Sequence, residues 1–338
     1  MKPERSRQIE AFLEAQGWGD CRRAPLAGDA SFRRYERLWR GADRAVLMDA
    51  PPPQENVRPF IAIDRLLAGA GLVVPAIHGA DEDAGLLLLD DMGDDTYTRL
   101  LARGEPEAKL YELAVDLLTE LHRRLPVERL AGVPRFEEVA ALRQVTLLLE
   151  WYWPATQGDQ VSPSAAAEFE AAWRNVFALW QRTPQGLVLF DYHVDNLMLL
   201  AGRSGVDSVG LLDFQDAVVG PCSFDLASLV DDARRDVAPA LGRHLMARYL
   251  AAFPGLDRAG FGAAYAASGA QRHTRILGTF TRLCRRDHKP AYLAFIPRVW
   301  RQLEAQLAHP ELAPLASWFA RYLPPEKRTV PPASWSSR

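Results

Sequence analysis

Three short apolar runs constrain the fold of this chain most strongly, because each has the length and the flanking turn residues of a buried strand. The runs span residues 187–190, 197–200 and 209–212. One polar residue stands at an end of each run: Asp191, Asn196 and Asp213. A carboxylate held at the end of a buried strand needs a partner. A metal ion bound to phosphate suits it, since Mg²⁺ is usually held by one or two carboxylates together with substrate phosphates.

The spacing of these polar residues matches a pattern found in phosphoryl-transfer enzymes. In that pattern an Asp accepts the proton of the attacking hydroxyl, an Asn five residues later holds a metal ion, and an Asp on a following strand also binds metal. Asp191, Asn196 and Asp213 occupy these positions. Each of them alone could simply be a turn former. Together, beside three apolar runs, they favour a metal-dependent transferase.

Length and composition are those of an ordinary globular protein. The chain has 338 residues, enough for two lobes with their own cores. Its apolar content of 48% and charged content of 25% are typical. A net charge of −3 gives no electrostatic reason to expect binding to nucleic acid or to an anionic membrane. Composition therefore gives no reason to expect nucleic acid or a membrane as a partner, and no protein partner is evident.

The cysteines and the N-terminus indicate the compartment. Cys21, Cys222 and Cys284 are odd in number and far apart, which favours a reducing environment without a disulfide framework. The first ten residues are polar and include Glu4 and Glu10, unlike a secretion signal. No apolar run approaches the ~18 residues that a membrane span needs. These features predict a soluble, cytoplasmic protein.

The first 92 residues predict a small, mainly antiparallel sheet with one main helix packed on it. The predicted elements are a short helix over 5–16, two strands joined by a turn at 28–31, a third strand after Gly41, a helix starting at Pro59, and strands over 72–77 and 86–90. The small residues of the turn at 28–31 would let backbone amides approach phosphate oxygens, and Arg33 could add charge. A plain hairpin turn is the alternative. Residues 90–94 are the expected hinge.

Residues 93–323 predict a larger, mostly helical lobe. The expected helices span 107–125, 137–153, 163–180, 223–230, 239–253, 261–285, 294–307 and 311–322. Asp225 either caps the helix at 223–230 or holds the turn around Asp191 by accepting backbone hydrogen bonds. Most arginines of the later helices are expected in solvent. The tail, 324–338, has the composition of a disordered end.

Five segments together resemble the aminoglycoside phosphotransferase/choline kinase-like family. They are residues 29–35 (DASFRRY), 46–52 (VLMDAPP), 191–198 (DYHVDNLM), 212–217 (LDFQDA) and 224–229 (FDLASL). The first and fourth point more narrowly to bacterial cell-wall sugar kinases, which phosphorylate N-acetylmuramate and N-acetylglucosamine at the anomeric hydroxyl. The resemblance covers residues 20–320.

This resemblance implies an α+β, two-lobed protein-kinase-like fold that binds ATP and Mg²⁺. It implies that Asp191 is the catalytic base and that Asn196 and Asp213 are the metal ligands. The residues that it places at the nucleotide are Ala30, Ser31, Phe32 and Arg33 in a covering loop, and Asp90 and Met92 at the hinge. His193 matches a histidine that is common after the catalytic Asp.

The sequence departs from the family pattern at two places. The strand lysine that pairs with nucleotide phosphates should fall near Met48, and no lysine is there. Phosphate binding then needs another base, such as Arg33 or Arg34. Leu189 and Phe190 stand where a histidine and an arginine or glycine are usual before the catalytic Asp.

The expected activity is ATP-dependent formation of a sugar 1-phosphate in peptidoglycan recycling. Candidates for contacts with sugar hydroxyls, chosen because they lie next to the catalytic turns, are His193, Asp195, Gln215 and Asp216. A substrate carboxylate, as in muramate, would favour an arginine from the C-terminal helices, but the sequence does not indicate which. The preferred sugar, the anomer and the oligomeric state are also open.

Two alternatives stay open at this point. One is a kinase acting on another small hydroxyl compound, such as an aminoglycoside, choline or homoserine. The other is a nucleotide-binding pseudokinase, for which Met48 in place of the strand lysine is the best support. The intact base and metal positions argue against the pseudokinase.

The first prediction concerns Asp191. The Asp191→Ala variant should fold normally but lose ATP-dependent sugar phosphorylation, because no other side chain is expected to take the proton of the hydroxyl. Circular dichroism checks that the variant is folded, and a coupled assay for ADP release measures its activity. A variant that is folded and still active would show that Asp191 is not the base.

Overall fold

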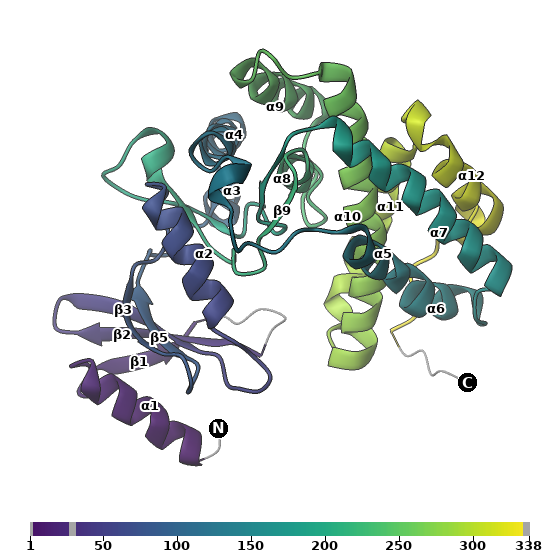
Figure 1. Cartoon of the computed structure of the whole chain (residues 1–338). Helices are drawn as coiled ribbons and strands as arrows, with labels where there is room; N and C mark the ends of the chain where they lie inside the picture. The colour runs from purple at the N-terminus through teal and green to yellow at the C-terminus, as the bar shows by residue number, and fades with distance from the viewer. Residues whose placement is uncertain (1–2, 27–31, 334–338) are drawn as a thin grey trace. The chain divides into compact units, whose positions relative to one another are not determined.

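The structure, a computed structural model, describes residues 3–26 and 32–333, and its chain forms two compact units (Figure 1). Unit 1 comprises Met1–Ala114 and Val194–Asp216, and unit 2 comprises Val115–His193 and Ala217–Arg338. The lobes expected over 1–92 and 93–323 remain a prediction, because a division by packing contacts is not a division by function.

Unit 1 contains a five-stranded antiparallel sheet. Its order is β1 (Arg22–Pro25), β2 (Arg34–Arg40), β3 (Asp43–Asp49), β5 (Leu86–Asp90) and β4 (Ile77–Asp81). Gly41, at φ +60°, closes the turn between β2 and β3, where glycine adopts a left-handed conformation without strain. The predicted small antiparallel sheet is therefore confirmed.

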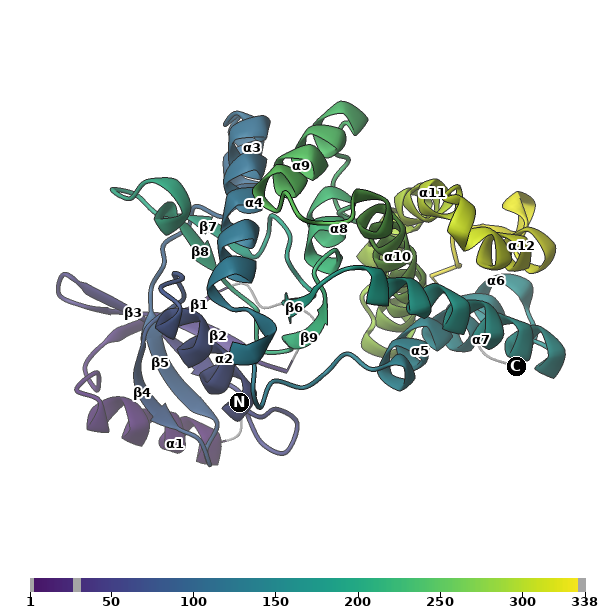
Figure 2. The ribbon, with the colours of Figure 1, turned by 45° about the horizontal axis from the view of Figure 1, so that its top comes forward.

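Two helices, α1 (Pro3–Ala15) and α2 (Arg58–Gly69), lie on opposite faces of this sheet (Figures 1 and 2). Strand side chains alternate between the faces. Accordingly Leu47 and Leu88, which are paired across β3 and β5, share a buried cluster with Phe12 of α1. Only the α2 side was predicted as the packed face of the sheet.

The predicted strand over 72–77 lies too early in the chain, since β4 begins at Ile77. Residues before Ile77 pair elsewhere: Val73 forms a bridge with Gly210, and the Leu211 N–H donates to the Val73 carbonyl at 2.9 Å. Gly210 belongs to β8 (Val209–Leu211), which pairs with β7 (Leu197–Leu199). The β-branched valines that suggested a strand thus make a short extended contact with a distant segment.

Unit 2 is mostly helical, and its predicted helices are confirmed to within a few residues at most ends. The helices of the chain from residue 97 onward are α3 (Tyr97–Ala102, in unit 1), α4 (Glu107–Arg124, which passes from unit 1 into unit 2), α5 (Glu138–Leu147), a π-helical turn (Leu148–Tyr152), α6 (Trp153–Gln157), α7 (Pro163–Ala178), α8 (Phe224–Val230), α9 (Pro239–Ala252), α10 (Arg258–Asp287), α11 (Ile296–Leu307) and α12 (Ala313–Tyr322). Short 3-10 helices span Val127–Arg129, Leu179–Arg182, Gly205–Ser208 (in unit 1), Pro290–Phe295, Pro310–Leu312 and Pro325–Lys327. A two-stranded sheet pairs β6 (Gln185–Val188) with β9 (Val218–Pro221).

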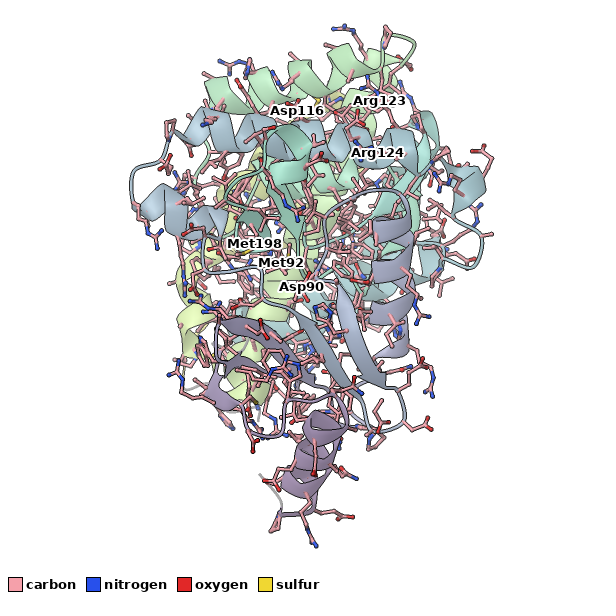
Figure 3. All side chains as sticks on the ribbon, turned by 90° about the vertical axis from the view of Figure 1, so that its left-hand side faces the viewer. Asp90, Met92, Asp116, Arg123, Arg124 and Met198 are labelled. Atoms are coloured by element: carbon pink, nitrogen blue, oxygen red, sulfur yellow. The ribbon has the colours of Figure 1, made fainter. Side chains whose placement is uncertain are left out.

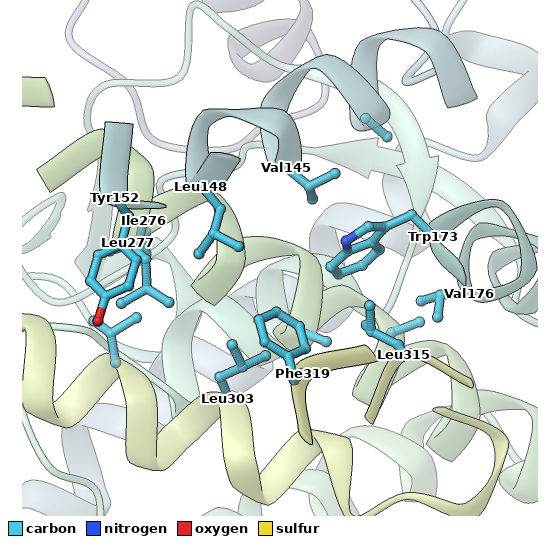
Figure 4. Close-up of a cluster of buried hydrophobic side chains, with 14 of the residues drawn as sticks. Val145, Leu148, Tyr152, Trp173, Val176, Ile276, Leu277, Leu303, Leu315 and Phe319 are labelled. Carbon is cyan, nitrogen blue, oxygen red and sulfur yellow. The ribbon is translucent and has the colours of Figure 1, made fainter. Parts of the chain in front are cut away.

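Helix α10 runs through the core of unit 2. Its residues Ile276 and Leu277 pack in a buried cluster with Leu148 of the π-helical turn, Trp173 of α7 and Phe319 of α12 (Figure 4). Burial of each such large apolar side chain stabilises the fold by roughly 1.5–3 kcal/mol. This core fixes α10 and every side chain that α10 carries.

At Gly278 the backbone of α10 lies very close to the backbone of Leu147. A Cβ atom at this position would lie 2.2 Å from the Leu147 carbonyl carbon and 2.3 Å from its oxygen. Leu147 is the last residue of α5, and the π-helical turn starts at Leu148. The continuous helix predicted over 137–153 is therefore interrupted where α10 packs against it.

The predicted disordered tail differs from the structure over residues 324–333. The Tyr152 hydroxyl donates to the Thr329 carbonyl at 2.7 Å, and Arg328 lies over the Trp300 ring at 5.0 Å. These long-range contacts hold a segment whose proline-rich composition suggested disorder. Residues 334–338 lie outside the described residues.

The structure also bears on the expectations for membrane spans and for disulfides. In the part of the chain that the structure describes, no helix is long and apolar enough to cross a bilayer. All three cysteines are free.

The second prediction uses two glycines of α10. Gly278→Ala should lower the free energy of unfolding by about 1–3 kcal/mol, because the added methyl group clashes with the backbone at Leu147. Gly262→Ala, where nothing lies within 4 Å of the added Cβ, should instead stabilise the helix by about 0.5–1 kcal/mol. Urea unfolding of both variants measures the difference. Equal stabilities would contradict the packing described for α10.

Candidate functional site

The segment that carries Asp191 is held by Asp225. Strand β6 ends at Val188, and the carboxylate of Asp225, on α8, accepts hydrogen bonds from the backbone N–H groups of Leu189 at 2.6 Å and Phe190 at 3.0 Å. The Ser228 hydroxyl, one turn later on α8, donates to the Phe190 carbonyl at 2.9 Å. Of the two roles expected for Asp225, the holding of the turn is confirmed.

Phe190 adopts a backbone conformation that is unusual for a bulky residue. Its φ is +65°, a region that side chains other than glycine rarely occupy. The ring packs edge-on against Phe136 at 4.8 Å and Phe224 at 5.1 Å between centroids. Such strained residues persist only where the surroundings fix them, and they cluster at functional sites. Asp213 is also of this kind, with φ +57°.

Burial dominates the electrostatics of Asp225, which is 0% exposed. Burial raises its pKa to about 7, against the opposing effect of the two backbone N–H donors. The ionised form is the one that accepts both hydrogen bonds most strongly. The group is therefore balanced between a desolvation penalty and the hydrogen bonds that shape the turn.

Asp191 lies among cationic side chains of its own unit. Desolvation by the surrounding protein opposes ionisation of its carboxylate, which is nevertheless 40% exposed, but Arg275, His193, Arg272 and Arg234, in decreasing order of effect, outweigh desolvation and lower the pKa below its ordinary value. A guanidinium nitrogen of Arg275 is 3.8 Å from a carboxylate oxygen of Asp191. Asp191 is thus ionised at neutral pH, as an acceptor of a hydroxyl proton must be.

His193 follows Asp191 into the interior of unit 2, where it is 4% exposed. Burial lowers its pKa, and Asp232 opposes this effect. A guanidinium nitrogen of Arg234 lies 3.5 Å from the Nε2 atom of His193. These contacts give His193 a structural role, and its predicted contact with sugar stays a prediction.

Arg272 is an exception to the expectation that most arginines of the later helices are solvated. It is 1% exposed and donates to the Asp231 carbonyl at 3.2 Å. Burial lowers its pKa to about 10. A buried arginine three residues before Arg275 adds positive charge to the surroundings of Asp191, which pattern analysis of α10 did not predict.

Asn196 and Asp213 are brought together inside unit 1 by the pairing of β7 with β8. Leu197 is opposite Leu211, and the Leu212 N–H donates to the Asn196 carbonyl at 3.0 Å. The Asn196 amide nitrogen lies 3.5 Å from an oxygen of Asp213. Phe214, 0% exposed, anchors the segment against Phe60 of α2 at 4.9 Å between ring centroids.

These two side chains fit a magnesium ion by their donor set. One amide oxygen and one carboxylate are hard oxygen ligands, and Asp213 is 34% exposed and so can be reached from solvent. Over the described residues, no group of three or more His, Cys, Asp or Glu side chains could hold a metal ion. An ion at Asn196 and Asp213 would therefore need further oxygens, which nucleotide phosphates supply.

The other candidates near this pair are engaged within unit 1. The Gln215 amide donates to Asp213 at 2.8 Å and to Asp216 at 3.4 Å. The Asp195 carboxylate accepts a hydrogen bond from the Thr98 hydroxyl. These hydrogen bonds stabilise the turns that carry Asp213 and Asp195. The predicted contacts of Asp195, Gln215 and Asp216 with sugar stay predictions.

The predicted nucleotide loop is described only in part, since Ala30 and Ser31 lie outside the described residues. Phe32 is 67% exposed, and its N–H donates to Glu55 at 3.1 Å. The Arg33 guanidinium donates to the other oxygen of Glu55 at 3.0 Å and lies 3.8 Å from Asp213.

Arg33 is a base that lies close to the candidate metal ligand Asp213. Burial disfavours its charge, but Tyr35, Glu55, Asp213 and Asp216 outweigh burial and raise its pKa. Met48, at the position expected for the family lysine, is 0% exposed and sits opposite Leu87 in the sheet. Arg33 can therefore supply the positive charge that Met48 does not.

The expected hinge is fixed by Arg37 of β2, which is 8% exposed. Its guanidinium donates to Asp94 at 3.0 Å, and to Asp91 and the Gly93 carbonyl at 2.9 Å each. Sequence analysis missed Arg37 because its partners lie more than fifty residues away.

Asp90 and Met92, the two hinge residues predicted to lie at the nucleotide, are adjacent in sequence to Asp91, which Arg37 holds. We call the hydrogen bonds of Arg37 to Asp91, Gly93 and Asp94 the Arg37 clamp. Asp90 accepts hydrogen bonds from the Ala76 N–H at 3.3 Å and pairs with His78 at 2.6 Å. Met92 lies beside Met198 (Figure 3), and a Cβ on Gly210 would fall 2.2 Å from the Met92 methyl group. The absence of a side chain at Gly210 thus makes room for Met92.

The predicted site residues fall into two groups. Asp191 and His193 belong to unit 2, whereas the other described candidates belong to unit 1. The structure brings the members of each group together within their own unit. That the two groups act as one site stays a prediction.

The third prediction concerns the Asp225 clamp, the pair of hydrogen bonds that the Asp225 carboxylate accepts from Leu189 and Phe190. Asp225→Asn keeps the shape but places an amide donor where two backbone N–H groups need an acceptor. We expect about 1–3 kcal/mol lower stability, and a loss of activity of at least about tenfold, since small misplacement of a catalytic group is severe. Asp159→Asn, an exposed change in the same unit, is the matched control.

The pH dependence of stability checks the same clamp. The pKa of Asp225 is raised from 3.8 to about 7, so its contribution is complete below pH 4 and is lost as pH rises through 7. The difference in unfolding free energy between the wild type and Asp225→Asn should shrink over this window, by up to about 1.4 kcal/mol per pH unit. A difference that is constant from pH 4 to 7 would contradict the assignment.

Comparison with known proteins relates this geometry to a family. A sequence profile described as the phosphotransferase enzyme family matches residues 22–263. An N-acetylmuramate/N-acetylglucosamine kinase of Caulobacter vibrioides is 39% identical, with 97% of this chain and 99% of the relative covered. A protein of the same name from Pseudomonas aeruginosa is also 39% identical, with 92% of each chain covered.

Solved structures confirm the predicted α+β kinase-like fold. A choline/ethanolamine kinase family protein from Mesorhizobium loti superposes with a TM-score of 0.62 at 16% identity, covering 93% of this chain and 98% of the other. An ADP-bound aminoglycoside phosphotransferase gives a TM-score of 0.57 at 17% identity, covering 90% and 98%. The family profile and the relatives at 39% identity establish that the chain belongs to the phosphotransferase enzyme family.

Proposed function

We propose that this protein transfers the terminal phosphate of ATP to the anomeric hydroxyl of N-acetylmuramate and N-acetylglucosamine. The observation that carries the proposal is the match, at 39% identity over 97% of the chain, to a relative that bears the name of this activity. The role expected in the cell is peptidoglycan recycling. Because ATP is a cytoplasmic metabolite, the proposal includes a cytoplasmic location.

Asp191 is proposed as the base. The hydroxyl oxygen of the sugar attacks the terminal phosphorus of ATP, its O–H proton passes to the Asp191 carboxylate, and the bond from phosphorus to the bridging oxygen breaks to release ADP. An anomeric hydroxyl is more acidic than an ordinary alcohol. A carboxylate whose pKa is lowered by Arg275 and its neighbours is therefore basic enough.

Asn196 and Asp213 are proposed to hold a magnesium ion, which would offset the charge of the terminal phosphates. Arg33, 3.8 Å from Asp213, is proposed to contact the same phosphates in place of the missing strand lysine. Phosphoryl transfer asks little covalent chemistry of a protein, so positioning and charge neutralisation supply most of the rate.

The hinge residues are proposed to bind adenine through the backbone of residues 89–92. The Arg37 clamp supports this role, because it ties Asp91 and Asp94 to the sheet and so fixes the backbone between them. A preorganised hinge loses little conformational entropy when the base binds.

A cationic acceptor such as choline or an aminoglycoside suits the surroundings of Asp191 poorly. Arg275, Arg272 and Arg234 surround the carboxylate, and like charges repel. Of the acidic residues that could attract a cation, Asp236 is already paired with Arg298 at 2.9 Å. This distribution of charge supports a neutral or anionic acceptor.

The fourth prediction tests the proposed reaction by ³¹P NMR. ATP, Mg²⁺ and either sugar should give ADP and a phosphate signal coupled to the anomeric proton. Asp213→Ala should lower kcat on the order of 100-fold or more, because charge stabilisation at the phosphates is lost. Asp207→Ala, an exposed change in the same unit, should leave kcat unchanged. Consumption of ATP with phosphate on another hydroxyl, or none with either sugar, would overturn the proposal.

A further inference from the structure

We propose that Arg275 binds the carboxylate of N-acetylmuramate and so sets the preference of the site for this acceptor over N-acetylglucosamine. The inference rests on the proposed function and concerns a residue for which sequence analysis gave no specific role. It starts from one fact of geometry: an Arg275 guanidinium nitrogen lies 3.8 Å from the Asp191 carboxylate, within unit 2.

That distance leaves the donors of Arg275 available. A hydrogen bond between such groups spans about 2.7–2.9 Å, as in the pairing of Arg248 with Asp116 at 2.7 and 2.8 Å. Within residues 3–26 and 32–333, Asp191 is the one carboxylate that forms an ion pair with Arg275. A guanidinium group has five N–H donors, and here none is committed to a close carboxylate.

Exposure distinguishes Arg275 from Arg272, and its contacts distinguish it from Arg234, which is also partly exposed. The side chain of Arg275 is 18% exposed and that of Asp191 is 40% exposed, so a solute can reach both. Arg272 is 1% exposed and is bound to the Asp231 carbonyl. Arg234 lies against His193. Arg275 is therefore the arginine of this group best placed to meet a ligand at Asp191.

The position of Arg275 is fixed. Its guanidinium carbon lies 5.7 Å from the centroid of the Phe190 ring, which is itself packed between Phe136 and Phe224. Helix α10 carries Arg275 between buried residues Thr274 and Ile276. A preorganised guanidinium binds a carboxylate at a lower entropy cost than a mobile one.

The charge around Arg275 calls for an anion. Arg272 precedes it by three residues and Arg282 follows by seven, which places all three on one side of α10. Burial and then Arg275 lower the pKa of Arg272, against Asp232 and Asp191; burial, Arg286 and Arg275 lower the pKa of Arg282, against Asp287 and Glu150. An anionic group bound at Arg275 would relieve this repulsion.

The chemistry of the acceptor matches this arrangement. In N-acetylmuramate the lactyl carboxylate is attached two ring carbons from the anomeric carbon. We infer that, with the anomeric hydroxyl on Asp191, this carboxylate comes within reach of the guanidinium group beside Asp191. N-acetylglucosamine has a hydroxyl at that position and offers no charge to Arg275.

The test measures kcat/KM of the full-length protein with both sugars. Arg275→Met should lower kcat/KM for N-acetylmuramate by about 10- to 100-fold, the size expected for a charge-assisted hydrogen bond. The loss with N-acetylglucosamine should be much smaller, because this sugar has no carboxylate for Arg275 to bind and loses only through the effect of Arg275 on Asp191. Arg286→Met, on the same helix and paired with Asp287 at 2.7 Å, should leave both values unchanged.

The ratio of the two losses separates this role from a merely electrostatic one. Removal of Arg275 also raises the pKa of Asp191, but this effect is common to both sugars and is small at a pH well above neutral. Equal losses with the two sugars, or no loss with either, would overturn the inference and leave the proposed function intact. A wild type inactive on both sugars would overturn the proposed function, and the inference with it.

The methyl ester of N-acetylmuramate provides a second test that does not depend on folding of the Met variant. The wild type should use the ester about 10- to 100-fold less efficiently than the acid. Arg275→Lys, which keeps the charge but loses the planar fork, should reduce this discrimination. Equal use of acid and ester by the wild type would overturn the inference.

Discussion

The hydrogen bonds from Leu189 and Phe190 to the buried carboxylate of Asp225 are the interaction on which this account most depends. Without them a turn with Phe190 at φ +65° would relax to an ordinary conformation. The carboxylate needs these donors as much as the turn needs the carboxylate, because an ionised group at 0% exposure without partners is unstable. This mutual dependence fixes Asp191, the next residue in the chain.

The same turn links the core of unit 2 to the charge around Asp191. Phe190 points its ring into the aromatic cluster with Phe136 and Phe224, while the following residue carries its carboxylate toward Arg275. Helix α10 contributes Ile276 and Leu277 to the core and, at the preceding residue, the cationic side chain of Arg275. Stability and electrostatics are thus set by adjacent residues of one turn and one helix.

Sequence analysis located the features that depend on neighbours in the chain. The runs before Asp191 and Asp213 and the periodic helices have local signatures, and the structure contains each of them. Sequence analysis gave Asp225 two possible roles, a helix cap or a support for the turn around Asp191, and the structure shows the second. The family resemblance, now confirmed, supplied the roles that local patterns cannot.

The features that sequence analysis missed depend on contacts between distant segments. Arg37 and Asp94 are 57 residues apart, and Arg275 is 84 residues after Asp191, so no local period relates them. Composition also misled at the tail, where Thr329 is held by Tyr152 from 177 residues away. A valine-rich segment at Val73 was assigned to the sheet although its partner is Gly210.

The central claim is that Asp191 accepts the proton of the sugar while Asn196 and Asp213 bind the metal beside the phosphates. A crystal structure of the full chain with Mg²⁺, a non-hydrolysable ATP analogue and N-acetylglucosamine tests it most directly. The account predicts the anomeric oxygen within about 2.6–3.2 Å of an Asp191 oxygen and the metal bound to Asn196 and Asp213. A sugar that presents another hydroxyl to Asp191, or a metal held by other residues, would contradict it.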